Sequence, residues 1–152
     1  MCPVEEGKYF GIFSYASTVT DIINAKGNTL YDIYIPDSVE IIYRDAFQGQ
    51  SNLCNINIPH NCIIESRALS DSNIKIIEVD GTVTIYEHAL PETVVSILAD
   101  KLVLRDSALK NLDGNSLKIW AKNIDGHLSD CLPENTCVYF GDPYVQYSDI
   151  DI

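Results

Sequence analysis

The chain has 152 residues, 46% of them hydrophobic, and its 22 acidic and 10 basic residues give a formal net charge of −12. This size and composition predict one domain with a sizeable core, and no run of apolar residues is long enough to span a membrane as a helix. Because binding to nucleic acid needs basic contacts to phosphates, the charge argues against direct nucleic-acid binding.

The first 29 residues differ in pattern from the rest of the chain. Residues 8–15 contain four aromatic side chains and predict a strand, and residues 17–23 predict either a degenerate repeat or a short helix. Residues 1–6 have neither the basic region nor the apolar region of a secretory signal. We therefore expect a cytoplasmic protein with no membrane contact.

From residue 30 the chain repeats a pattern of about 21 residues, a period typical of solenoid proteins. An Ala-Phe or Ala-Leu pair recurs at Ala46, Ala68, Ala89 and Ala108, in steps of 22, 21 and 19 residues. A weaker copy follows at Cys131-Leu132. Each copy opens with a strand-like run, and these first runs cover residues 30–35, 53–58, 74–79, 94–99 and 117–122.

The copy that ends at Phe47 carries the clearest family resemblance. Its run Ile-Pro-Asp-Ser-Val-Glu-Ile-Ile-Tyr-Arg-Asp-Ala-Phe, preceded by Leu-Tyr-Asp-Ile-Tyr, resembles the BspA-type leucine-rich repeat. The next copy repeats the Ile-Pro step at Ile58-Pro59. The resemblance implies a mainly β fold, namely a right-handed leucine-rich-repeat solenoid with a parallel sheet, little helix and irregular terminal caps.

One such unit cannot bury its apolar side alone, so consecutive units must stack as coils and complete one another's core. In the first two coils we expect the aliphatic positions of the strand-like runs, such as Ile33 and Ile35, to point inward. The Ala is expected to fit a tight corner, and the Phe or Leu that follows it to fill the interior. Each buried aliphatic side chain then contributes roughly 1.5–3 kcal/mol before entropy is counted.

The last part of the repeat region is less regular. In residues 117–122 the pattern places Trp120 inward, whereas a slip of one residue would turn it outward; we favour the inward position. Residues 137–152 predict a last strand or hairpin, a C-terminal cap and an acidic tail. We thus expect a single domain over residues 1–152, with a cap at 1–29, about five repeats at 30–136 and a second cap at 137–152.

No motif of an enzyme or a phosphate-binding loop occurs in the sequence. The three histidines lie in three different coils, and the five cysteines contain no Cys-x-x-Cys pair, so we predict no metal site and no cofactor. Residues that precede the corner Ala should form a stacked row of Asp45, Arg67, His88 and Ser107. We interpret this row as solvated structure and predict that the protein is not an enzyme.

A binding surface is expected on the outward, concave face of the first strands. Exposed apolar side chains rimmed by polar ones typically mark contact surfaces. We therefore predict a protein-binding module. Its expected partner is another protein, such as a basic one, or a second copy of the chain. The alternative is a small acidic inhibitor that mimics nucleic acid and blocks a basic nucleic-acid-binding machine. The candidate residues are Asp32, Tyr34, Asn55, Asn57, Ile76, Glu78, Ser96, Leu98 and Ile119.

Overall fold

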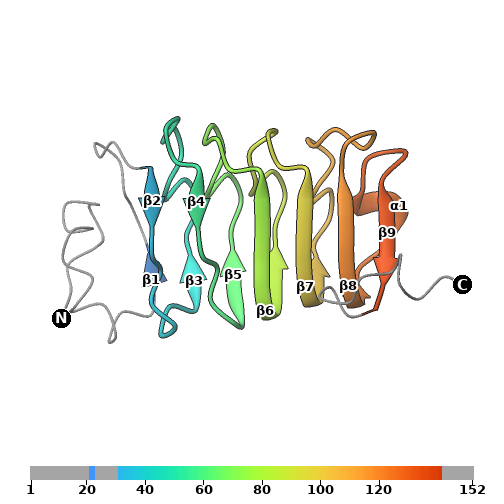
Figure 1. Ribbon diagram of the computed structural model, residues 1–152, viewed down its shortest axis with the longest axis horizontal. Helices are drawn as coiled ribbons and strands as arrows, with labels where there is room; N and C mark the ends of the chain where they lie inside the picture. The colour runs from blue at the N-terminus through green and yellow to red at the C-terminus, as the bar shows by residue number, and fades with distance from the viewer. Residues whose placement is uncertain (1–20, 23–30, 142–152) are drawn as a thin grey trace, which may run out of the picture.

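The computed structural model describes residues 21–22 and 31–141 of the chain. They form a row of stacked coils in which every strand pairing is parallel (Figure 1). Among these residues only the short helix α1 (Leu128–Cys131) is α-helical. The predicted mainly β solenoid with a parallel sheet and little helix is therefore confirmed.

The strands of the described residues pair in parallel with strands of neighbouring coils. One sheet has the order β1-β3-β5-β6-β7-β8-β9, and a second sheet pairs β2 with β4. The bounds are β1 (Asp21–Ile22), β2 (Asp32–Ile33), β3 (Ile41–Ile42), β4 (Asn55–Ile56), β5 (Cys62–Ile64), β6 (Ile76–Ile85), β7 (Ser96–Leu104), β8 (Lys118–Asp125) and β9 (Cys137–Phe140).

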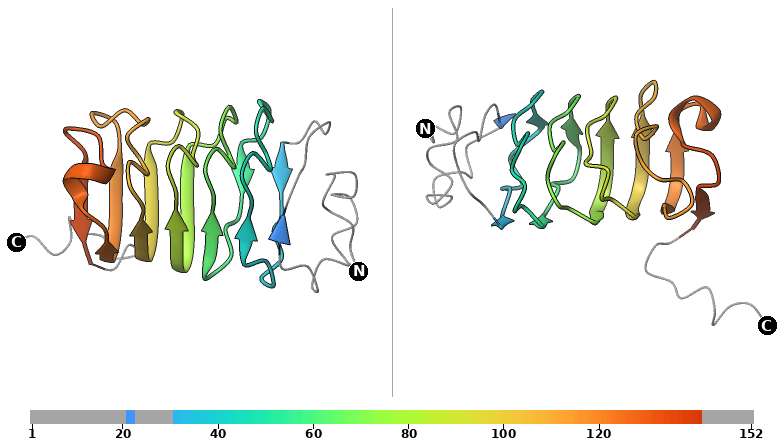
Figure 2. Two further views of the ribbon diagram at one scale, coloured as in Figure 1. Left: turned by 180° about the vertical axis from the view of Figure 1, so that it is seen from behind. Right: turned by 90° about the horizontal axis from the view of Figure 1, so that it is seen from above.

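Each coil runs along one face of the stack, turns at an edge and returns along the opposite face (Figures 1 and 2). We call the outward side of the first strands the front face; it is formed by β2, β4, β9 and the first parts of β6, β7 and β8. The back face carries β1, β3, β5 and the second parts of β6, β7 and β8. Strands β6 and β7 continue through the turn, which is marked by a shift of register between Val79 and Thr82.

The core lies between the two faces. Ile33 and Ile35 of the first described coil are buried, as the repeat pattern predicts, and so are Leu53 and Ile58 of the next. Ile56, which the pattern also places inward, is only partly buried. The residue after each corner Ala is fully buried at Phe47, Leu69, Leu90 and Leu109.

The corners stack directly on one another. At the first corner the Phe47 amide donates to the Ala68 carbonyl at 2.8 Å, and at the next the Leu69 amide donates to the Ala89 carbonyl at 2.8 Å. The residue before the Ala has a positive φ of 54° to 61° in every copy, at Asp45, Arg67, His88 and Ser107. This conformation resembles the third position of a type II turn, which reverses the chain sharply.

The fifth corner confirms the weak copy at Cys131-Leu132. Both side chains are buried, and the Leu109 amide donates to the Cys131 carbonyl at 2.9 Å, as between regular corners. Helix α1 occupies the place of the tight turn that precedes the corner elsewhere. Cysteine here packs as a small apolar side chain in the position of the usual Ala.

The expected inward position of Trp120 is wrong. Ile119 and Ala121 are fully buried and pair with the inward residues Ile97 and Ala99 of β7, so β8 has slipped by one residue relative to the pattern. Because side chains alternate along a strand, this slip turns Trp120 outward. The slip also places Lys122 outside the core. Its Nζ lies there 3.0 Å from the Asp100 carboxylate, and both side chains are partly exposed.

The chain ends are only partly described. Asp21 and Ile22 pair in parallel with Ile41 and Ile42, which favours the degenerate repeat over the helix at this position. Residues 137–140 form the predicted last strand. The strand expected at 8–15, most of the cap expected at 1–29 and the tail after residue 141 lie outside the described residues.

Candidate functional site

Eight of the nine predicted surface residues lie on the front face with side chains that solvent can reach. Ile76 is 55% exposed and Tyr34 is 60% exposed, whereas Leu98 is half-buried. The ninth residue, Ile119, is wrongly placed by the prediction, because the slip in β8 buries it completely. Trp120 takes its place on the front face.

An aromatic pair extends the front face toward the C-terminal end. The rings of Trp120 and Tyr139 stack with centroids 5.0 Å apart and an angle of 15° between their planes. Leu98 is the register neighbour of Trp120 on the other side, so the three side chains form one row across β7, β8 and β9. Sequence reasoning missed this pair, although the strict alternation of Leu117, Ile119 and Ala121 would have indicated the register.

An open groove lies on the front face between the coil of β4 and the coil of β6. Its volume is about 930 Å³, and five of the predicted residues line it, together with Ile33, Ile56 and Asp80. These five are Tyr34, Asn55, Asn57, Ile76 and Glu78. The structure therefore gathers more than half of the predicted set into one hollow, whereas Asp32, Ser96 and Leu98 lie outside it.

The groove exists because the front ladder is interrupted at this point. Strand β4 pairs with β2 alone, and β6 pairs with β7 on its front part but with β5 only through Val83 to Ile85 on the back face. The Asn73 amide still donates to the Leu53 carbonyl at 2.8 Å where the two coils enter the front face. Beyond that bond no strand pairing joins the two coils on the front face, and the inward residue Ile56 beside the groove is only partly buried.

Two of the groove residues also serve the neighbouring coil. The Asn57 amide group accepts from the Ile35 N–H at 2.6 Å and donates to the Ile35 carbonyl at 2.7 Å, which replaces the missing backbone ladder there. Asn55 Nδ2 donates to the Asp32 carboxylate at 2.6 Å. Asn57 is therefore a structural wall of the groove as well as a predicted contact residue.

Replacing Asn57 by Ala is expected to destabilise the protein by about 1–3 kcal/mol, because the Ile35 N–H and carbonyl lose both partners in a partly buried place. Urea unfolding followed by circular dichroism measures the change. The matched control is Asn55→Ala, which removes one exposed hydrogen bond and should cost at most about 1 kcal/mol. Equal effects of the two substitutions would contradict the structural role of Asn57.

A family comparison adds to this geometry. The model of the BspA type leucine rich repeat region matches residues 16–96, more than half of the chain, in six copies. The chain belongs to the BspA-type leucine-rich repeat family. The matched part of this BspA-type protein includes β1 and the whole groove. Neither the curated proteins nor the solved structures gave a match.

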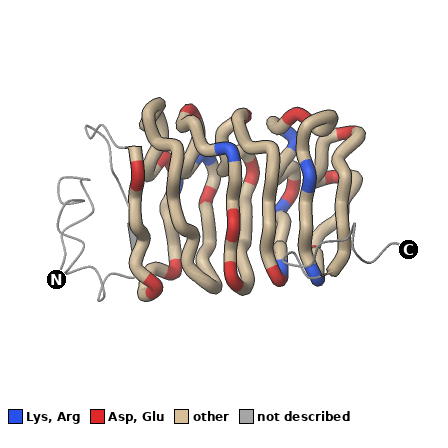
Figure 3. The backbone as a smooth tube through the Cα atoms, in the orientation of Figure 1, with Lys and Arg blue, Asp and Glu red and all other residues tan. Residues whose placement is uncertain are grey.

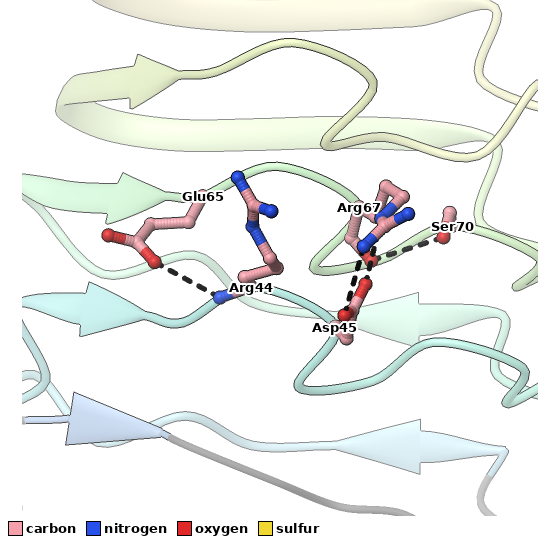
Figure 4. Close-up of polar contacts among 5 residues, drawn as sticks. All are labelled: Arg44, Asp45, Glu65, Arg67 and Ser70. Carbon is pink, nitrogen blue, oxygen red and sulfur yellow. Dashed lines mark hydrogen bonds and ion pairs between the residues drawn. The ribbon is translucent and has the colours of Figure 1, made fainter.

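The corner row of this BspA-type protein forms one ion pair among its described residues. Arg67 Nε lies 3.0 Å from Asp45 Oδ1, and Arg67 Nη2 donates to Asp45 Oδ2 at 3.2 Å (Figure 4). A carboxylate oxygen of Glu65 accepts from the Arg44 N–H at 3.1 Å nearby. Because Arg67 is half exposed, such a pair contributes at most about 1 kcal/mol, in keeping with a structural role.

The histidines and cysteines of the described residues lie apart. No group of three or more His, Cys, Asp or Glu side chains in the described ranges could hold a metal ion. We call the side of the stack where the first strands turn into the back face the lower edge. There His60 Nδ1 accepts from the Thr82 N–H at 3.2 Å. Of the cysteines, Cys62 and Cys131 are buried, whereas Cys54 and Cys137 are exposed. Cys54 is thus more exposed than a core thiol.

Alkylation should separate these thiols. Burial raises the pKa of the Cys62 thiol to about 12, so the reactive thiolate is scarce at mildly alkaline pH. With iodoacetamide we expect rapid modification of Cys54 and Cys137, and modification of Cys62 and Cys131 only after unfolding in guanidinium chloride. Peptide mapping by mass spectrometry identifies each site. Rapid labelling of Cys62 in the native protein would contradict its place in the core.

No helix in residues 21–22 or 31–141 has the length and apolar character needed to cross a membrane.

Proposed function

We propose that this protein is a non-enzymatic protein-binding module and that the front face is its contact surface. Leucine-rich repeats generally mediate protein interactions and are generally not enzymes. The expected partner is a protein that lies across several coils, because the exposed apolar side chains are spread along the stack rather than gathered in one deep pocket.

One observation carries this proposal. Of the eight large hydrophobic side chains that the described residues leave exposed, six belong to residues on the first strands or directly beside them. Scattered single apolar residues need no explanation, but a surface that collects most of them is typical of a contact site. The six are Tyr31, Tyr34, Ile76, Val95, Tyr139 and Phe140.

The side-chain chemistry of the described residues supports binding rather than catalysis. The histidines at positions 60, 88 and 127 lie in separate coils, and none of them neighbours a nucleophile in the hydrogen bonds found. A catalytic site needs such groups within hydrogen-bond reach of one another. We accordingly propose no reaction and no cofactor for this surface.

Affinity capture from extract of the source cells tests the front face. We compare the wild type with a front variant, Ile76→Ser combined with Leu98→Ala and Tyr139→Ala. The matched back variant is Ile41→Ser combined with Ile63→Ala and Tyr86→Ala, which trims exposed or half-buried positions on the other face. A partner lost by the front variant alone supports the proposal, and a partner retained equally by both overturns it. Circular dichroism confirms that both variants fold.

The salt dependence of capture separates the two function classes. A mimic of nucleic acid binds through charge, so its affinity falls steeply between low and high salt, whereas apolar contacts persist. Basic residues are interspersed with acidic ones along the described coils (Figure 3). Lys75 lines the groove of the front face, and Lys118 pairs with Ser96 in its first strands. This distribution favours the protein-binding module.

Sedimentation equilibrium of the pure protein tests self-association.

A further inference from the structure

We propose that the groove between β4 and β6 binds an extended peptide segment of the partner, with alternating apolar and basic side chains, as an added β-strand. This inference rests on the proposed function, since it names the class of partner and the way in which it is held. The recognition mode is β-strand addition, in which main-chain hydrogen bonds supply affinity and alternate side chains supply specificity.

The backbone of the neighbouring coils shows what the groove lacks. In the step into β4, the amides of Cys54 and Asn55 donate to the Tyr31 carbonyl at 2.9 and 3.2 Å. In the step into β7, the amides of Val95 and Ser96 donate to the Lys75 carbonyl at 2.8 and 3.3 Å. These two pairs of bonds occupy equivalent positions in the repeat.

The step from β4 to β6 has no strand pairing on the front face. Both facing edges, residues 54–58 and 75–79, therefore present main-chain groups that a ladder partner occupies elsewhere in the stack. An unpaired edge of this kind is a template for another strand. A peptide placed in the groove would meet such an edge on each side, which a strand added to the end of a sheet does not.

The side chains around the groove define the peptide. Ile33 and Ile56 lie on the core side, and Ile76 stands 55% exposed at the rim, so side chains that point inward should be apolar. Glu78 and Asp80 line the mouth toward the lower edge, so side chains that point outward there should be basic. The edge of five residues at 54–58 spans about 16 Å, enough for a peptide of five or six residues.

One charge in the groove opposes a uniformly basic peptide. Lys75 lines the end at which the coils enter the front face, opposite to the end that carries Glu78 and Asp80. The preference for basic side chains should therefore be strongest at the Glu78 end. A second copy of this acidic chain is a poorer occupant, because its net charge of −12 repels the same mouth.

Synthetic hexapeptides provide the probe. Three fluorescent peptides of the form Lys-X-Lys-X-Lys-X, with X as Val, Tyr or Phe and both ends blocked, are titrated with the full-length protein, and anisotropy is measured. We expect saturable binding of at least one of them. N-methylation of alternate backbone amides in that peptide should weaken binding by roughly tenfold or more, because it removes the hydrogen bonds of one edge. Replacing its lysines by glutamates should weaken binding by a similar factor.

Variants locate the binding. Glu78→Lys combined with Asp80→Lys should weaken binding by about tenfold. The matched control is Glu87→Lys combined with Asp106→Lys, at exposed acids away from the groove, and it should stay within about twofold. Hydrogen exchange should slow at residues 54–58 and 75–80 when the peptide is bound. Absence of saturable binding by all three peptides, full binding of the N-methylated peptide, or equal effects of both variant pairs would overturn the inference.

The capture experiment distinguishes this inference from the proposed function. If the front variant loses the captured partner but the hexapeptide at saturation does not displace it, the front face stands as the contact surface and the strand-addition mode fails. If the hexapeptide binds the groove but the front variant retains the partner, the groove binds peptide and the proposed contact surface fails.

Discussion

Replacing Phe47 by Ala is expected to lower the free energy of unfolding by about 3–5 kcal/mol. The Phe47 side chain is fully buried between the two faces and fills the interior of its coil. The backbone at this position is held by the hydrogen bond from the Phe47 amide to the Ala68 carbonyl, so the corner cannot collapse to fill the space. The loss therefore combines the transfer free energy of the ring with the cost of a cavity.

Urea unfolding, followed by circular dichroism and by tryptophan fluorescence, measures the effect of Phe47→Ala. The matched control is Phe140→Ala, because Phe140 is 59% exposed at the last coil and its loss should change stability by at most about 1 kcal/mol. In a solenoid each coil contacts only its neighbours, so the coil of Phe47 can unfold before that of Trp120. A change below about 1 kcal/mol for Phe47→Ala would contradict the stacked core.

Replacing Gly81 by Ala is expected to destabilise the protein by about 2–4 kcal/mol, from two additive causes. Gly81 has a φ of +130°, a conformation that side-chain-bearing residues rarely adopt, and a Cβ added there would lie 1.7 Å from His60 Nδ1. His60 cannot simply move aside, because its Nδ1 accepts from the Thr82 N–H at 3.2 Å. The substitution should thus loosen the turn that joins the front and back faces beside the groove.

Three further variants, namely Gly49→Ala, His60→Ala and the double variant, separate the causes for Gly81. Gly49→Ala is the control for backbone strain alone, since Gly49 has a φ of +80° but an added Cβ would meet nothing within 4 Å; it should cost about 1 kcal/mol. His60→Ala combined with Gly81→Ala removes the steric conflict, so its cost should be smaller than the sum of the two single substitutions. Thermal unfolding by calorimetry measures the wild type, the single variants Gly49→Ala, His60→Ala and Gly81→Ala, and the double variant. Additive costs would show that His60 does not cover Gly81.

The cysteine and Asn57 experiments probe different parts of the same stack. Asn57 tests the wall of the groove, where a side-chain amide stands in for backbone pairing with Ile35. The buried thiol of Cys62 tests the core side of β5 on the back face, and that of Cys131 tests the fifth corner. Together with the substitutions above, they cover the front face, the back face, the corners and the lower edge.

The repeat, the parallel stacking and the corners could all be predicted from the amino-acid sequence. These features depend on local spacing: an aliphatic four residues before each Ala, and a Phe or Leu directly after it, recur at a nearly constant step. Because one coil cannot bury its own apolar side, that spacing alone requires neighbouring coils to pair in register. The exposure of Tyr34 and Ile76 and the burial of Ile33 follow from the same pattern.

The register of β8 and the position of the groove depend on contacts between neighbouring coils. A slip of one residue exchanges Ile119 and Trp120 between core and surface, and the neighbouring strand, through Ile97 and Ala99, selects which of the two registers fills the interior. The groove likewise lies where two coils lack strand pairing on the front face while they stay paired on the back face. Both are properties of contacts between coils. Within a single repeat, the alternation of Leu117, Ile119 and Ala121 is the one signal for the register of β8, and the spacing of the repeat gives no signal for the groove.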